Sequence, residues 1–574
     1  MRVLHFKQRL KYQTPPMHAE NPDNGDPFDA ASREPRTGVI LALLLAAALI
    51  PRLVVFPINE NFHGDAVART ELAERWAAHP HWISSFQDGA YQFGPLHLYT
   101  VGAALWAWPD RENAGRAVSL LFGVLSVVPL YFLTRRLFGW KAGLAAGLGF
   151  AAWGMHVQLS TTASSEALAL FLVLCVLHYY AKAREDGRLG SLFSSALLLN
   201  LACATRYEAW LLIPLLGALL LVAEKDKIAA LTRTAIFTLA CLPFPAFWMQ
   251  GNERDMGSPL YPIAFIEHYH HNWVADGVAA WGEPFFRLQN LFFWPGVALF
   301  TLTPLVGLFG VVGMVAAWRR FPEHRWLVWL VVVPASYFTF RSAVLLDFVP
   351  LGRFTVGQVA LLLPFVALGF AAVAAKFAAP LRHGLVSVTA LVAVVMPAWL
   401  GLFTWQAQQG AALSLSPVSP VGTNPPQLMQ VARFLRQQVA PGPGTVVLDA
   451  DSKFQDVQIG FYSGLPESRL ARVRWDTFDR KLAIEPPEYL VRIEGGELNK
   501  RADFEARGGH VTLGEVWFEE LGGFRAPMHV YRRVRTEERR PATAQELVGE
   551  RFDQERPMLV PAPPPAAPRE LAVP

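Results

Sequence analysis

The residues of this 574-residue chain that are best suited to chemistry are acids, histidines and arginines that lie between long apolar runs. They are Asp65, Glu166, Arg206, Glu208, Glu267, His268, His270, His271, Asp347 and Arg353. A carboxylate can take a proton from a hydroxyl group, and a guanidinium can hold a phosphate through paired hydrogen bonds. Ionisable groups at the edge of a hydrocarbon layer are costly, so this set indicates a functional site.

The composition indicates that helices in a lipid bilayer position these groups. Charged residues make up 17% of the chain, against about 25% in soluble proteins, and AVILMFWYC residues make up 52%. A soluble globule could not bury so much apolar surface, so a soluble enzyme, a disordered chain and a coiled coil are excluded. The three cysteines all lie in apolar runs and provide no disulfide framework.

Eleven apolar runs predict about eleven transmembrane helices. They are 38–58, 117–134, 142–165, 167–181, 189–205, 209–223, 234–252, 288–318, 326–340, 354–375 and 384–404. Three of them have only 15 uncharged residues, fewer than the about 20 that cross a bilayer core. These short runs can still span if the flanking Lys and Arg side chains extend to the interface.

The run at 95–108 could span the membrane or lie flat on it, and the basic residues favour the second reading. If it lies flat, five loops with 14 Lys and Arg face the cytoplasm, and the opposite short loops hold five. Cytoplasmic loops carry the excess of positive charge. We therefore expect 59–116 to be the first external loop, with surface helices. The polar segment 1–37, with six Lys and Arg, is expected to be cytoplasmic.

The composition of the sequence changes after the last apolar run. Residues 405–425 read as a linker, 426–540 as an extracytoplasmic α/β domain and 541–574 as a Pro- and Ala-rich disordered tail. Within the domain we expect a helix at 426–439 and strands at 444–450, 488–495, 511–518 and 528–534. The expected fold is an all-α polytopic membrane bundle with this small C-terminal domain.

Several stretches, in their order and sidedness, resemble the GT-C superfamily of integral-membrane glycosyltransferases. They are NFHGDAVARTELAERW at 61–76, YQFGPLHLYTVGAALWAW at 91–108, residues 116–150, SSEALALFLVL at 164–174, TRYEAWLLIP at 205–214 and SPLYPIAFIEHYHHNW at 258–273. The chain is most similar to the glycosyltransferase family 39-like enzymes, namely the protein O-mannosyltransferases and the lipid A aminoarabinose transferase. The resemblance covers 38–404.

This resemblance implies a hexosyl- or pentosyltransferase. It would move a sugar from a polyprenyl-phosphate donor to a hydroxyl of a protein or lipid acceptor, by an inverting direct displacement on the extracytoplasmic face. The expected location is a bacterial inner membrane, and the basic residues mark topology rather than a nucleic-acid partner. The alternative is a lipid-linked sugar flippase, which would need polar groups near the midplane of the bilayer.

The resemblance also assigns roles to residues. Asp65 matches an acidic residue early in the first external loop and is expected to be catalytic, although an Asp before AVARTELAERW could also be an N-cap. Glu166 is expected to contact substrate or metal, or else to start a helix. Arg353 resembles an Arg-aromatic step associated with lipid phosphate, and an interfacial snorkelling Arg is the alternative.

The remaining candidates lie in two short motifs. Arg206 and Glu208, two residues apart in TRYEAW, either pair with each other or anchor the donor head group. Residues two apart on a helix do not face each other, so separate partners and the second reading are favoured. Glu267 and His268 match an acidic-His pair of related transferases and are expected near the donor phosphate. The cofactor stays open: Asp65, Glu166, His268 and His271 could ligate a divalent metal, or the His-rich stretch is simply solvated.

One departure from the family pattern concerns the donor phosphate. Many bacterial relatives carry a Lys-Pro-Pro-like step where this chain has Gln92-Phe93-Gly94-Pro95. The absent Lys removes a phosphate contact and argues against aminoarabinose as the transferred sugar.

Overall fold

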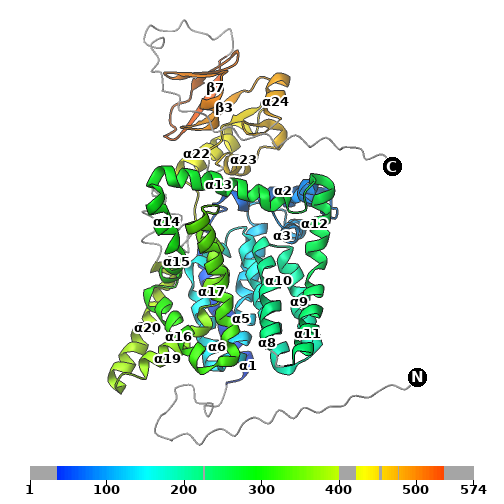
Figure 1. The fold of residues 1–574 in the computed structure, drawn as a ribbon. Coiled ribbons are helices and arrows are strands. Elements are labelled where there is room, and N and C mark those ends of the chain that lie inside the picture. The colour runs from blue at the N-terminus through cyan, green and yellow to red at the C-terminus, as the bar shows by residue number, and fades with distance from the viewer. Residues whose placement is uncertain (1–34, 224–225, 400–421, 452–454, 476, 535–574) are drawn as a thin grey trace, which may run out of the picture.

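The computed structural model describes residues 35–223, 226–399, 422–451, 455–475 and 477–534. Most of the expected N-terminal segment 1–37, nearly all of the linker 405–425 and the whole tail 541–574 lie outside the described residues. A helical bundle forms the lower part of Figure 1, a layer of helices covers its upper end, and a domain with a β-sheet stands above that layer.

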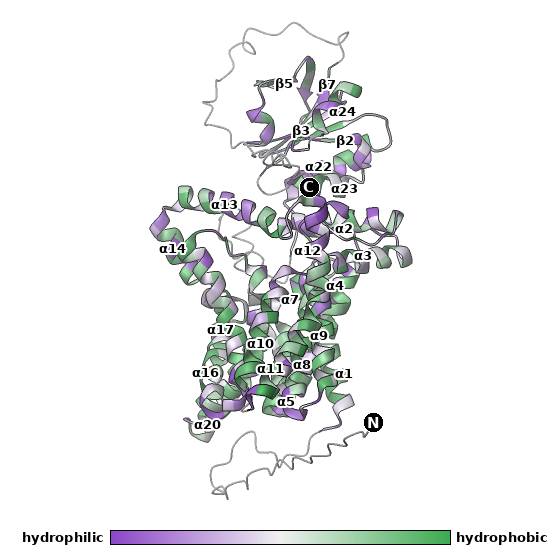
Figure 2. Cartoon of the chain, turned by 45° about the vertical axis from the view of Figure 1, so that its right-hand side comes forward, coloured by the Kyte–Doolittle hydropathy of each residue, from purple (hydrophilic) through white to green (hydrophobic). Residues whose placement is uncertain are grey.

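The bundle is built from the apolar runs. Its elements are α1 (Thr37–Val55), α4 (Ala114–Leu125), α5 (Val127–Phe138), α6 (Trp140–Ala152), α7 (Gly154–Leu159), α8 (Ser165–Asp186), α9 (Leu189–Cys203), η2 (Tyr207–Leu211), α10 (Leu212–Ala223), α11 (Lys227–Cys241), α12 (Pro243–Met256), α15 (Phe293–Thr301), α16 (Pro304–Arg320), η3 (Pro322–His324), α17 (Arg325–Thr339), η4 (Phe340–Leu345), η5 (Gly352–Thr355), α18 (Val356–Ala360), α19 (Leu363–Ala374) and α20 (Ala379–Trp399). Figure 2 shows that apolar residues concentrate on these helices.

The eleven expected spans are not confirmed as a count. Among the described residues, four helices are long and apolar enough to cross a membrane, or up to seven if each bent pair is one span. The run at 288–318 is bent by 119° between α15 and α16, where Thr303 has a φ of 66°. The run at 142–165 is interrupted at Trp153, whose extended backbone separates α6 from α7. A continuous apolar run thus does not guarantee one straight helix.

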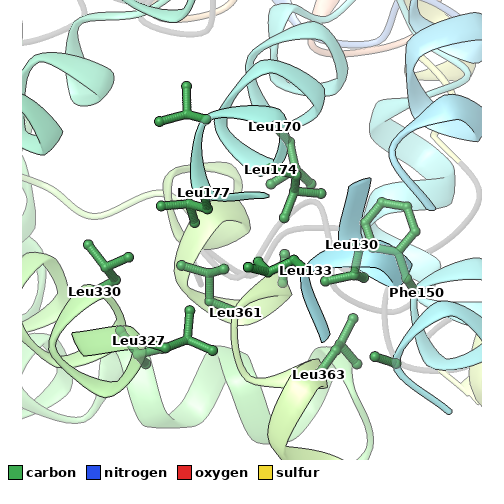
Figure 3. Close-up of a cluster of buried hydrophobic side chains, with 14 of the residues drawn as sticks. Leu130, Leu133, Phe150, Leu170, Leu174, Leu177, Leu327, Leu330, Leu361 and Leu363 are labelled. Carbon is green, nitrogen blue, oxygen red and sulfur yellow. The ribbon is translucent and has the colours of Figure 1, made fainter. Parts of the chain in front are cut away.

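The interior of the bundle is a large apolar cluster to which distant helices contribute leucines. Leu130, Leu174, Leu330 and Leu363 lie in it with a few per cent exposure or less, and they come from α5, α8, α17 and α19. Figure 3 shows these side chains. Helices α16 and α19 approach most closely at Gly313 and Gly369. A Cβ on Gly313 would lie 1.8 Å from the Phe365 carbonyl oxygen, so glycine permits this backbone contact.

The upper layer holds the parts of the chain between the apolar runs. It consists of α2 (Gly64–Ala78), η1 (Phe86–Ala90), α3 (Pro95–Ala107), α13 (Tyr261–Trp281) and α14 (Glu283–Leu291). The 95–108 run forms α3, which packs against α2 rather than deep among the bundle helices. Figure 2 shows more hydrophilic residues on α2 and α13 than on the bundle below them.

The C-terminal domain has a seven-stranded mixed sheet in the order β2-β1-β3-β7-β6-β5-β4. Its elements are α22 (Pro426–Phe434), η6 (Leu435–Val439), β1 (Val446–Leu448), α23 (Gln455–Ser463), η7 (Glu467–Arg469), β2 (Leu470–Arg472), α24 (Phe478–Ile484), β3 (Tyr489–Ile493), η8 (Glu497–Lys500), β4 (Phe504–Arg507), β5 (His510–Leu513), β6 (Val516–Glu520) and β7 (Met528–Arg533). Strand β1 is parallel to β2 and β3, and the other neighbours are antiparallel.

The expected C-terminal helix and the strands β1, β3 and β7 are confirmed. The expected strand at 511–518 is wrong as one strand, because the chain turns at Gly514 (φ +59°) and forms the hairpin of β5 and β6. A left-handed residue in the middle of an apparent strand favours glycine and marks such a turn.

Candidate active site

A cavity of about 260 Å³ lies where α2, α13 and the upper end of the bundle meet. Its lining residues include Asp65, Arg69, Phe93, Arg206, Glu208, Glu267, Tyr269, His270, Trp273, Arg341, Phe348 and Arg353. A smaller cavity of about 100 Å³, lined by Glu166 and mostly apolar side chains, shares Arg206, Glu208 and Arg353 with the first. Five of the seven predicted site residues line the larger cavity; Glu166 and His268 do not.

Asp65 lies in the first turn of α2 and faces a cation from a distant segment. It is not the N-cap that its sequence position allowed, because His63 is the N-cap and accepts a hydrogen bond from the Ala66 amide. Arg353, from the short helix η5, donates through Nη2 to Asp65 Oδ2 at 2.5 Å. Asp65 and Arg353 thus form an ion pair across 288 residues of sequence.

Glu166 and Arg206 form a second, more deeply buried ion pair. Glu166 is in the first turn of α8, and its side chain is only 2% exposed. Its Oε1 accepts from Arg206 Nη1 at 2.7 Å and lies 3.8 Å from Arg353 Nη1. A carboxylate buried to this degree is normally retained only with such partners, so the two cations account for its burial.

Arg206 and Glu208 bond to each other, contrary to the expectation that each needs a separate partner. Arg206 Nη2 lies 2.6 Å from Glu208 Oε1, and Arg206 Nε donates to Oε2 at 3.2 Å. The spacing rule for helices does not apply here, because Arg206 has an extended backbone and the 3₁₀ helix η2 begins only after it. Arg206 therefore bridges Glu208 and Glu166.

A second ionic cluster lines another part of the cavity. Arg341 contacts Glu267 at 2.9 Å and Asp347 at 3.0 Å. His268 does not line the cavity, and its contact with Asn272 is long, at 3.4 Å. His270 lines it instead, and its Nδ1 accepts a hydrogen bond from the Val349 amide at 3.1 Å.

The histidines and acids proposed as metal ligands do not converge in the part of the chain that the structure describes. No group of three or more His, Cys, Asp and Glu that could hold a metal ion occurs there. His271 is exposed and absent from the cavity lining, whereas Asp65 and Glu166 are occupied by arginines. The described donor set therefore suits anion binding better than a divalent metal.

The charges around Asp65 set its protonation. Burial acts to raise the pKa of Asp65, but Arg353, Arg69 and His63 outweigh it and hold the pKa at about 2. Burial, together with the charge of Arg353, lowers the pKa of His63 to about 4. Asp65 is therefore a carboxylate and His63 a neutral imidazole at neutral pH.

Sequence reasoning missed Arg69 and Arg341. Arg69 is one helical turn after Asp65, so the two share a face of α2, and its guanidinium lies 4.1 Å from the centre of the Phe93 ring. Among the described atoms, Arg69 Nη1 and Arg353 Nη1 are buried without a hydrogen-bond partner. The four-residue spacing of Asp65 and Arg69 was the available signal. Nothing local in the sequence marked Arg341.

The comparisons with known proteins concern the family and the fold of the chain. The family model for dolichyl-phosphate-mannose-protein mannosyltransferases matches residues 94–248, which include Glu166, Arg206 and Glu208. No curated protein sequence matches the chain. The segment matched by the family model is about a quarter of the chain and does not contain Asp65 or Arg353.

Three solved structures share the fold. ArnT from Cupriavidus metallidurans bound to undecaprenyl phosphate has a TM-score of 0.57 and 15% identity, over 88% of this chain and 100% of that one. The apo state of the same ArnT has a TM-score of 0.52 and 17% identity, over 79% of this chain and 93% of that one. An Archaeoglobus fulgidus oligosaccharyltransferase tethered to an acceptor peptide has a TM-score of 0.50 and 13% identity, over 79% of this chain and 68% of that one.

The expected resemblance to the GT-C superfamily is confirmed. It rests on the family model over residues 94–248, and the solved structures add the shared fold. At 13–17% identity the solved structures establish the fold alone. The roles of individual residues rest on the cavity geometry.

Proposed function

We propose that this protein transfers a sugar from a polyprenyl-phosphate donor to a hydroxyl group of a protein or lipid acceptor. The observation that carries the proposal is the cavity wall on which the Asp65 carboxylate, paired with Arg353, lies beside the cations Arg69 and Arg206. One base and several cations suit the removal of a proton and the departure of a phosphate. The bound undecaprenyl phosphate of the ArnT structure supports the choice of donor.

In the proposed step, the acceptor hydroxyl attacks the anomeric carbon while Asp65 takes its proton. The bond between that carbon and the phosphate oxygen breaks, and the electron pair remains on the phosphate, which leaves as polyprenyl phosphate. A single displacement inverts the configuration at the anomeric carbon. Arg353 can contact both Asp65 and the phosphate. Its Nη2 holds Asp65, while its Nη1 has no hydrogen-bond partner among the described atoms.

The pairing with Arg353 also explains how a carboxylate with so low a pKa can act as a base. A carboxylate whose pKa is about 2 binds protons weakly. An anionic phosphate arriving at Arg353 would offset part of the positive charge that Asp65 experiences. The pKa of Asp65 would then rise, because nearby negative charge disfavours the carboxylate. Donor binding would thereby make the base stronger at the moment when it is used.

We further propose that the site faces the periplasm of a bacterial inner membrane and that residues 38–404 form the transferase domain. Helices α2 and α13, which help to line the cavity, lie toward the same end of the bundle as the C-terminal domain, whereas α1 begins at the opposite end (Figure 1). The 14 basic residues of the five expected cytoplasmic loops support this orientation.

The test of this function is transfer by the purified protein in detergent. It would be given labelled polyprenyl-phosphate hexoses and pentoses together with peptide and lipid acceptors. We expect at least one donor to release its sugar to a hydroxyl, with an inverted anomeric configuration by NMR. Retention of configuration would contradict the single displacement. Binding of every donor without transfer or hydrolysis would indicate a carrier instead.

A further inference from the structure

Helix α2 carries Asp65 on one face and the contact with the C-terminal domain on the other. Asp65 and Arg69 are one turn apart and both line the cavity. Val67 lies two residues after Asp65, which on an α-helix is about 200° away, on the opposite face. Val67 is fully buried in a cluster with Ala432 and Phe461 of the C-terminal domain.

The segment leading into α2 is tied to the same domain by hydrogen bonds. Tyr462 Oη accepts from the Asn61 backbone amide at 2.8 Å, and Gln458 Nε2 donates to the Phe62 carbonyl at 2.6 Å. The Asn61 side chain is fully buried, and its Oδ1 accepts from the Ala163 amide, three residues before Glu166. Asn61 therefore links the Asp65 segment, the Glu166 segment and the C-terminal domain.

A buried cation adds an ionic contact farther along α2. Arg472, on β2, has a side chain that is only 1% exposed, and its Nη2 lies 3.4 Å from Glu71 Oε1. The same Nη2 contacts Glu467 of its own domain at 3.0 Å. Glu71 follows Val67 by one turn, on the face of α2 that is turned away from Asp65. The C-terminal domain thus holds this face at two successive turns.

We propose that the C-terminal domain positions the catalytic carboxylate, with Tyr462 and Arg472 as its positioning residues. Tyr462 fixes the backbone just before α2, and Arg472 fixes the back of the helix, so that Asp65 stays in register with Arg353 on the bundle. The inference rests on the proposed role of Asp65. The domain is therefore part of the transfer machinery although none of its residues lines the two cavities described above.

The first experiment replaces Tyr462 with Phe in the full-length protein. The ring and its packing remain, while the buried Asn61 amide loses its acceptor. We expect kcat to fall about 10–100-fold, because small misplacements of catalytic groups cost rates of this order. The KM for the donor should stay within about threefold. Arg436→Gln is the matched control, because Arg436 crosses the same interface to Glu112 at an exposed position and should transfer normally.

A double-mutant cycle separates positioning from general damage. If Tyr462 acts through Asp65, then Tyr462→Phe should lower the residual rate of the Asp65→Asn variant by less than about twofold. An equal fall in both backgrounds, or an unchanged rate in the single variant, would overturn the inference while leaving the proposed function standing. Full transfer by Asp65→Asn alone would overturn the proposed function and this inference together.

Hydrogen exchange provides a readout that does not depend on activity. In Tyr462→Phe, amides of residues 59–70 should exchange faster than in the wild-type protein, whereas those of β3 and β7 should be unchanged. Unchanged exchange at 59–70 would refute the positioning role even if activity fell. Faster exchange throughout the C-terminal domain would show that the variant unfolds it, which would also contradict the inference.

Discussion

Replacement of Arg353 with Gln tests how the acidity of Asp65 is set. Arg353 is the strongest of the groups that lower the pKa of Asp65, whereas burial acts to raise it. The difference between about 2 and the ordinary 3.8 corresponds to about 2 kcal/mol in favour of the carboxylate, since one pKa unit is about 1.4 kcal/mol. Without Arg353, we expect the pKa of Asp65 to rise toward 3.8 or beyond.

The assay is sugar transfer measured between pH 3 and pH 8. In the free wild-type protein Asp65 is a carboxylate throughout this range. Protonation of Asp65 should therefore not reduce kcat/KM, which reports the pKa values of the free enzyme, above about pH 3. In Arg353→Gln the rate should fall as the pH drops below about 5. At pH 7 the variant should also be about 10²–10³-fold slower, because the leaving phosphate loses the hydrogen bond that Arg353 would donate to it.

Arg341→Gln is the matched control for this prediction. Arg341 lines the same cavity but pairs with Glu267 and Asp347 rather than with Asp65. The transfer rate of Arg341→Gln should depend on pH below about 5 in the same way as that of the wild-type protein. If Arg353→Gln also showed the wild-type pH dependence in this range, Arg353 would not set the pKa of Asp65.

Three further predictions concern stability. Gly313→Ala should destabilise the bundle by about 1–3 kcal/mol in a thermal unfolding assay, because its Cβ would lie 1.8 Å from the Phe365 carbonyl oxygen; Gly190→Ala, with no atom within 4 Å, is the control. Glu166→Ala should cost about 3 kcal/mol, because it leaves Arg206 and Arg353 without their buried carboxylate; an unchanged Tm would contradict the buried pairing. Burial lowers the pKa of His270 to about 4, so its stabilising contribution is complete above its unfolded pKa of about 6.5 and is lost as the pH falls toward 4. The Tm of His270→Gln should therefore vary less over this range than that of the wild-type protein, and equal dependence would refute the assignment.

The sequence predicted the class of fold because apolar runs and strand patterns are local properties. Most of the expected helical and strand segments are present, but the breaks at Thr303 and Trp153 depend on backbone angles that hydropathy does not report. The strand at 511–518 was misread for a similar reason, because one glycine turns an apolar segment into a hairpin. Strand β2 escaped notice because three residues are too few to carry an alternating pattern.

The residues of the site could be predicted from the sequence more readily than the contacts between them. Asp65 and Arg353 were both identified as candidates, but a contact across 288 residues is set by tertiary packing that no local pattern encodes. Separate partners for Arg206 and Glu208 were favoured over a mutual ion pair on a helical rule that an extended residue does not obey. The contacts of Tyr462 with Asn61 span 401 residues and could only be found in the structure.

The role of Asp65 is tested most directly by single-turnover transfer with the Asp65→Asn variant and a donor that the wild-type protein uses. Asp255→Asn is the control, since Asp255 pairs with Arg254 and lies outside the cavity lining. We expect Asp65→Asn to transfer about 10²–10⁴-fold more slowly while remaining folded, the range attributed to a positioned base. Asp255→Asn should retain the wild-type rate. Transfer at the wild-type rate by folded Asp65→Asn would contradict the assignment of this carboxylate as the base.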